Sequence, residues 1–179
     1  MRTLRIIAIL WLPLITGCAT RVPFTHQLRQ EYSLGDTELR QIQYYVSGSI
    51  TLQRDLATGE ARVTPGHKIK ILKDRRVEEI KIRPGTPGIA EGVGPHSLDV
   101  SFEEGSRLSF GSDPKHRDSW GGKYTMFAEK WEGGRGQITY QGKTFWAIDA
   151  SGNVYLMVNL RELSKFKKET LVLPGRRLR

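Results

Sequence analysis

Cysteine is almost absent from this chain, since Cys18 is the only one among its 179 residues. A lone cysteine forms no internal disulfide, so the fold must rest on a hydrophobic core. Histidine is also scarce, and none of the four shows the spacing of a zinc pair; they are His26, His67, His96 and His116. We therefore expect no metal site and no cofactor.

Acidic residues are outnumbered, with 19 Asp and Glu against 28 Lys and Arg, which gives a formal net charge of +9. Such an excess favours contact with anionic lipid headgroups, acidic polysaccharide or nucleic acid. The alternative is a soluble domain that merely stays clear of its isoelectric point. The composition is otherwise that of a globular protein, with 38% hydrophobic and 26% charged residues.

Long hydrophobic runs are missing too. The apolar stretch Ile6–Leu12 is too short to span a bilayer, which takes about 20 residues. It follows Arg2 and Arg5 and leads toward Thr16, Gly17 and Cys18. A basic start, a short apolar run and a small-residue boundary are typical of an export signal.

The tetrapeptide Ile15-Thr16-Gly17-Cys18 resembles the lipobox of bacterial lipoproteins. The resemblance implies a signal peptide over residues 1–17, cleavage between Gly17 and Cys18, and a lipid on the Cys18 thiol. Acyl chains bury methylenes in the bilayer and anchor a protein stably when two or more are attached. With Ala19 rather than Asp after the cysteine, the family pattern implies the outer membrane of a Gram-negative host, facing the periplasm. Nucleic acid is then not an expected partner.

The mature chain is predicted to start with a tether over residues 18–24, followed by one β-rich domain over residues 25–179. Thr25 and Asp36 suit helix N-caps, which predicts two short helices near residues 25–31 and 37–42. From Gln43 onward β-forming residues alternate with polar ones between turn residues. The predicted fold is mainly β, an antiparallel meander forming a small barrel or sandwich, preceded by the two helices.

Several hairpins can be placed within this pattern. The strand runs are expected at residues 44–53 with a bulge or bend at Gly48, at 69–71 with 77–82, at 98–102 with 108–110, at 124–128, at 138–140 with 145–148, at 154–160 and at 171–173.

The segment from Phe24 to Arg54 is also similar to uncharacterised outer-membrane lipoproteins of Gram-negative bacteria. The similarity rests on Phe24-Thr25, Leu28-Arg29, Tyr32, Leu34, Gln43-Tyr44-Tyr45 and Ile50–Arg54. This group implies a location in the envelope and no particular chemistry.

Catalytic motifs are sparse. The loop Asp113–Asp118 offers two carboxylates and His116, enough for acid/base or metal chemistry, although Lys115 and Arg117 oppose a cation. The alternative interpretation is a solvated polar loop without a chemical role. No Gly-x-Ser-x-Gly elbow occurs, and lipidation consumes the only thiol. We therefore expect a protein without enzymatic activity.

Candidate binding residues are Trp120 and Trp131, which lie beside glycine turns, and Arg176 and Arg177 in a basic tail. Aromatic rings there can stack on sugars, or they can plug the ends of a sandwich. The first hypothesis is a membrane-anchored scaffolding or binding module that contacts an envelope protein. The alternatives are a binder of cell-wall glycan or anionic headgroups, and an envelope hydrolase that uses the Asp113–Asp118 loop.

The lipid anchor is directly testable. The substitution Cys18→Ser removes the sulfur that is alkylated, so it should abolish incorporation of a fatty-acid analogue and release the protein from the membrane fraction. Metabolic labelling followed by fractionation measures both, and labelling that persists in the variant would contradict the anchor.

Overall fold

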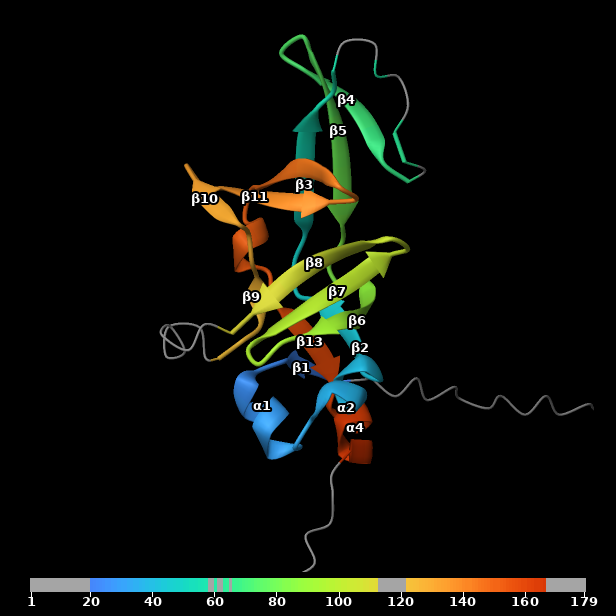
Figure 1. Ribbon diagram of the computed structural model, residues 1–179, viewed down its shortest axis with the longest axis vertical. Coiled ribbons are helices and arrows are strands. Elements are labelled where there is room, and N and C mark those ends of the chain that lie inside the picture. Colours follow the sequence, from blue (N-terminus) through green and yellow to red (C-terminus); the bar gives the residue numbers. More distant parts are fainter. Residues whose placement is uncertain (1–19, 58–59, 61–62, 65, 113–121, 167–179) are drawn as a thin grey trace, which may run out of the picture.

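The computed structural model describes residues 20–57, 60, 63–64, 66–112 and 122–166 (Figure 1). Several residues singled out above lie outside the described residues: Gly17, Cys18, Trp120, Arg176, Arg177, the loop Asp113–Asp118 and the expected strand at 171–173. Within the described part of the chain, no helix is long and apolar enough to cross a membrane.

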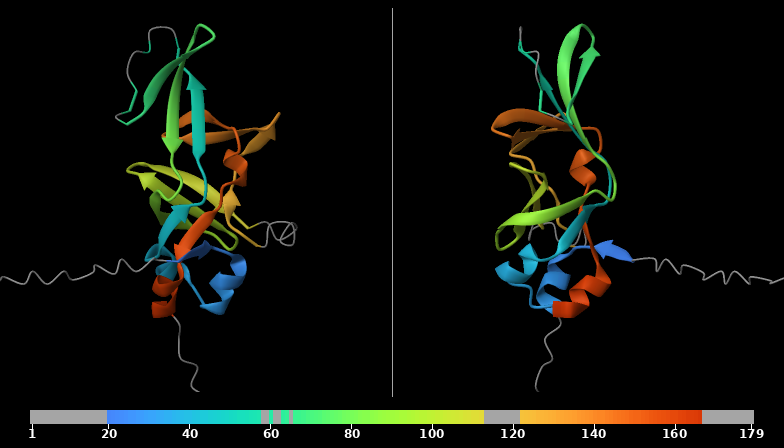
Figure 2. Two further views of the ribbon diagram at one scale, coloured as in Figure 1. Left: turned by 180° about the vertical axis from the view of Figure 1, so that it is seen from behind. Right: turned by 90° about the vertical axis from the view of Figure 1, so that its right-hand side faces the viewer.

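Two antiparallel sheets make up the body (Figures 1 and 2). In spatial order, the seven-stranded sheet contains β1 (Arg21–Pro23), β13 (Leu156–Asn159), β2 (Gln43–Val46), β6 (Pro87–Val93), β7 (Ser97–Glu103), β8 (Ser106–Gly111) and β9 (Thr125–Met126). The six-stranded sheet contains β10 (Lys130–Glu132), β11 (Arg135–Tyr140), β12 (Lys143–Ile148), β3 (Ile50–Asp55), β5 (Arg75–Ile82) and β4 (Lys68–Leu72).

The helical elements are few and short. They are α1 (His26–Glu31), α2 (Asp36–Arg40), α4 (Leu160–Leu163) and the 3-10 turns η1 (Ser151–Asn153) and η2 (Ser164–Phe166). The predicted fold class is confirmed: the protein is mainly β, with two antiparallel sheets, one of them a curled half-barrel.

Three bent segments of the chain belong to both sheets. The strands β13, β2 and β6 are neighbours in one sheet, and the strands joined to them in the chain, β12, β3 and β5, are neighbours in the other. Each segment therefore crosses from sheet to sheet while keeping its neighbours. One contiguous set of buried side chains, from Phe24 to Leu163, packs across both sheets.

We call the region where the three segments pass between the sheets the crossing. Polar contacts of Ser47 and Ser151 stabilise it. The backbone N–H of Ser47 donates to the carbonyl of Tyr155 at 2.9 Å, and the Tyr155 N–H donates to Oγ of Ser47 at 3.0 Å. Ser151 is fully buried, and its Oγ accepts from the Thr51 N–H at 3.0 Å. A Cβ at Gly48 would lie 3.1 Å from a Val154 methyl. The bend expected at Gly48 is thus confirmed, and it splits the run 44–53 between β2 and β3.

The first predicted helix is confirmed at its start, where Oγ1 of Thr25 accepts from the Leu28 N–H at 3.1 Å. The second differs by one residue, because Gly35 and not Asp36 is the N-cap. The Glu38 carboxylate accepts from the Gly35 N–H at 3.0 Å, while Asp36 pairs with Arg40 at 2.9 Å. The Glu38 carboxylate, in the first turn, thus accepts the hydrogen bond of a backbone N–H at the start of the helix, and its negative charge suits the helix dipole there.

The tether expected over residues 18–24 is shorter in the structure. Arg21–Pro23 form β1, which pairs with β13, and Phe24 is fully buried. Its N–H donates to the Leu156 carbonyl at 2.8 Å. So few residues show no apolar alternation, yet this segment joins the sheet because it pairs with the apolar strand β13. A strand therefore precedes the two helices.

The predicted hairpins β4–β5, β7–β8 and β11–β12 are confirmed. The strand order departs from a simple meander, because β2 lies between β13 and β6 and β3 lies between β12 and β5. These long-range pairings follow from the shared crossing, which no local pattern reveals.

Ser151→Ala tests the crossing. The substitution leaves the buried Thr51 N–H without its acceptor, so the free energy of unfolding should fall by about 1–3 kcal/mol. Ser49→Ala, at an exposed neighbouring position, is the matched control and should change it little. Chemical denaturation measures both, and equal stability of the two variants would argue against this role of Ser151.

Candidate functional site

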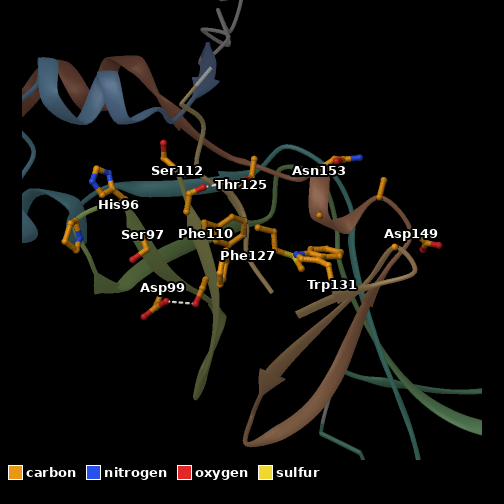
Figure 3. A pocket seen from close by; sticks show the side chains of 17 residues that line it. His96, Ser97, Asp99, Phe110, Ser112, Thr125, Phe127, Trp131, Asp149 and Asn153 are labelled. Atoms are coloured by element: carbon orange, nitrogen blue, oxygen red, sulfur yellow. Dashed lines mark hydrogen bonds between the residues drawn. The ribbon is translucent and has the colours of Figure 1, made fainter. Parts of the chain in front are cut away.

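A groove of about 1100 Å³ lies between β8 and β9 of one sheet and the β10–β11 hairpin with η1 of the other (Figure 3). Its apolar part includes Phe110, Met126, Phe127 and Trp131, and its polar part includes His96, Asp99, Ser109, Ser112, Thr125, Asp149 and Asn153. A mostly apolar hollow with a few polar groups at its margins is the usual form of a ligand site.

Trp131 of β10 forms one wall of this groove. Its indole lies against two glycine backbones, because a Cβ at Gly152 would come within 2.5 Å of the ring and one at Gly136 within 2.9 Å. Only glycine at these positions lets the ring lie so close. The side chain nevertheless remains 43% exposed. The indole is therefore fixed on one side and accessible on the other.

Phe127 lines the same groove and is 63% exposed. Strand alternation explains this position, because Met126 and Ala128 on either side of it point into the core. The Phe127 N–H donates to the Ser109 carbonyl at 2.8 Å, which fixes the backbone here. Two large exposed aromatic rings in one groove form an apolar patch, and such patches mark contact sites.

The far end of the groove is polar. The Ser112 side chain is buried, and within the described ranges neither its Oγ nor Nδ1 of His96 has a hydrogen-bond partner. The Ser112 N–H donates to the His96 carbonyl at 2.9 Å, and the His96 ring packs at 4.6 Å from that of His26. Unpartnered buried polar atoms are costly, so a ligand that reaches them would gain hydrogen bonds.

Among the residues that the structure describes, two carboxylates line the groove, and they stand at opposite ends of it (Figure 3). Asp99 accepts from Oγ of Ser109 at 2.7 Å, near His96. Asp149 is exposed beyond Trp131 and has a positive φ of 57°. Asn153, also exposed, lies on this side as well. The groove thus offers separate acceptors along its length.

A second polar cluster is buried away from the groove, between the two sheets. Glu78 of β5 is 1% exposed, and its carboxylate accepts from Nε of Arg54 at 2.6 Å and contacts Nδ1 of His67 at 2.6 Å. Nε2 of His67 contacts Oε1 of Glu103 at 3.2 Å. Two carboxylates thus flank the ring, one at each ring nitrogen.

This cluster holds the segment that leads into β4. Arg54 makes two hydrogen bonds to Glu60, at 3.0 Å and 2.6 Å, and its guanidinium lowers the pKa of Glu60 to about 2. Glu103, at the end of β7, also accepts from the Tyr140 hydroxyl at 2.7 Å. Since the His67 and Glu78 side chains are each only 1% exposed, a substrate has no access to them. We interpret the cluster as a structural clasp.

Of the residues singled out from the sequence, the structure places Trp131 in the groove. Sequence reasoning missed Phe127, His96 and Ser112. Phe127 was open to inference, since Tyr124, Met126 and Ala128 define the opposite face. Among the described residues, no group of three or more His, Cys, Asp or Glu side chains is arranged to hold a metal ion.

Glu78→Gln tests the clasp. Removing this charge leaves Arg54 and His67 buried without their shared carboxylate, and the free energy of unfolding should fall by about 3 kcal/mol. Glu104→Gln, at an exposed position, is the control. Denaturant titration measures the free energy of unfolding of both variants. A Glu78→Gln protein as stable as the control would show that the cluster does not hold the sheets together.

No family model matches this chain, and neither the curated proteins nor the solved structures contain a match to it.

Proposed function

We propose that this chain is a lipid-anchored, non-enzymatic binding module of the bacterial envelope and that its groove binds a glycan of the cell wall. Cys18 carries the anchor, and the domain faces the periplasm from the outer membrane. The lipobox-like sequence Ile15–Cys18 supports the location. The geometry around Trp131 supports the ligand class.

The single observation that carries the proposal is the indole of Trp131, which is fixed against two glycines on one side and accessible to solvent on the other. A pyranose ring has one face of C–H groups, which packs on an aromatic ring, and a rim of hydroxyls, which needs hydrogen-bond partners. Trp131 and Phe127 offer the aromatic surface. Asp149 and Asn153 lie nearby as polar partners (Figure 3). A small number of polar groups around an apolar surface gives orientation and specificity.

The distribution of carboxylates favours binding over hydrolysis. A glycosidase places two carboxyl groups on either side of one bond, about 5–9.5 Å apart. Of the described residues, Asp99 and Asp149 are the carboxylates of this groove; they stand at opposite ends instead, and Asp99 accepts a hydrogen bond from Ser109 (Figure 3). The formal charge of +9, less the two charges of Arg2 and Arg5 in the signal peptide, leaves +7 on the mature chain, which adds attraction toward anionic cell-wall polymers.

Trp131→Ala should weaken binding of the full-length protein to glycan strands released from purified cell wall by about tenfold or more, as for other aromatic residues at the centre of an interface. Gly152→Val, which displaces the indole without removing it, should also weaken binding. Titration calorimetry in detergent measures each affinity.

Ile89→Ala, which removes an exposed apolar side chain from β6, is the matched control and should bind as the unmodified protein does. Retained affinity in both groove variants, or turnover of the glycan by the unmodified protein, would refute the proposal.

A further inference from the structure

The β4–β5 hairpin extends beyond the rest of the body, at the end of the long axis opposite to β1 (Figures 1 and 2). In the part of the chain that the structure describes, β4 is the edge strand of its sheet, and all five of its residues are exposed. Ile71 is 75% exposed, and Ile69 and Leu72 are also exposed. Apolar side chains gathered on a free strand edge are unusual, because such an edge can pair with another chain.

The backbone of this edge is set up for pairing. A two-residue turn, Lys73 and Asp74 with φ of 47° and 63°, joins β4 to β5 and closes on the pair Leu72–Arg75. Positive φ at both turn residues is the type I′ geometry, which closes on a hydrogen-bonded pair. Because hydrogen-bonded and non-bonded pairs alternate, Ile69 and Ile71 turn their backbone N–H and C=O groups toward the free edge.

The hairpin is strongly basic. Five cationic residues and one acidic residue lie between positions 68 and 76. Lys70 pairs with Glu79 at 2.6 Å and Arg75 pairs with Asp55 at 3.0 Å. Lys68, Lys73 and Arg76 have no ion-pair partner within the described part of the chain, and they are exposed. A strand that joined this edge would meet positive charge on its flanks.

Two other occupants fit these observations less well. A second copy that paired antiparallel about the centre of β4 would set Lys70 opposite Lys70, and like charges directly opposite one another are destabilising. A membrane would suit the basic and apolar character. However, β1 follows the proposed Cys18 anchor closely, so the hairpin, at the far end of the body, points away from the membrane that holds the anchor.

We propose that the free edge of β4 receives an extended, acidic segment of a partner protein as an additional strand. The backbone groups of Ile69 and Ile71 hydrogen-bond to it, and their side chains pack on its apolar residues. Lys68, Lys73 and Arg76 attract its carboxylates. Strand addition of this kind takes its affinity from main-chain hydrogen bonds and its specificity from alternate side chains. This surface is separate from the groove.

The probe is a capped peptide of alternating Glu and Val, titrated into the full-length protein while amide exchange and backbone NMR shifts are followed. Binding should weaken with salt. It should slow exchange of the Ile69 and Ile71 amides and leave the other strands unchanged. A peptide with alternating Lys and Val should not bind.

Ile71→Pro removes an edge N–H that pairs with no other described residue, and edge strands tolerate proline. It should lower peptide affinity at least tenfold. Lys73→Glu with Arg76→Glu should do so as well, without a change in the backbone of β4. The control is Lys165→Glu, which reverses an exposed charge in η2 and should leave the affinity unchanged.

Peptide binding that survives both hairpin variants would overturn the proposal. So would dimerisation of the protein through β4, or hairpin-dependent binding to vesicles of anionic phospholipid without binding to the peptide. Trp131→Ala should leave peptide binding intact, so a failure here and a failure of glycan binding are told apart.

Discussion

The structure depends on one crossing, where three bent segments pass from one sheet to the other. Because β2–β3, β5–β6 and β12–β13 keep the same neighbours on both sides, neither sheet has a separate centre of its own. The contacts of Ser151 with Thr51 and of Ser47 with Tyr155 join residues 100 and 108 positions apart in the chain. The seven-stranded sheet and the helices lie on one side of this crossing. The β10–β11 and β4–β5 hairpins of the six-stranded sheet lie on the other side. The groove lies where these two parts face each other.

The clasp around Glu78 stabilises the six-stranded sheet next to the β4–β5 hairpin, which extends beyond the rest of the body. A buried charge is stable only when it has a partner, and here Arg54 pairs with both Glu78 and Glu60. The His67 ring contacts Glu78 and Glu103 through its two nitrogens. The clasp joins the end of β7 to β5 and to the segment before β4. The exposed edge of β4 therefore belongs to a strand whose other side is well supported, and its exposure does not come from poor packing.

Local sequence patterns predicted much of this fold. Alternation and turn residues placed three hairpins, and Thr25 predicted a helix start. They could not reveal that β3 pairs with both β5 and β12, since such pairing depends on which chain segments share the crossing. The short pairing of Arg21–Pro23 left too little pattern to read. For the groove, Trp131 beside glycine turns was a usable signal. His96 and Ser112 were not, because a buried atom without a partner is a property of the assembled structure.

The contact of Trp131 with Gly136 and Gly152 bears on affinity as well as shape. A flexible aromatic side chain loses rotamer freedom when a ligand stacks on it, and that loss subtracts from the binding free energy. Here the two glycine backbones have already restricted the indole during folding. The entropy is lost once, when the protein folds, and not again with each ligand. Even a shallow contact at this ring can therefore contribute most of its interaction energy to binding.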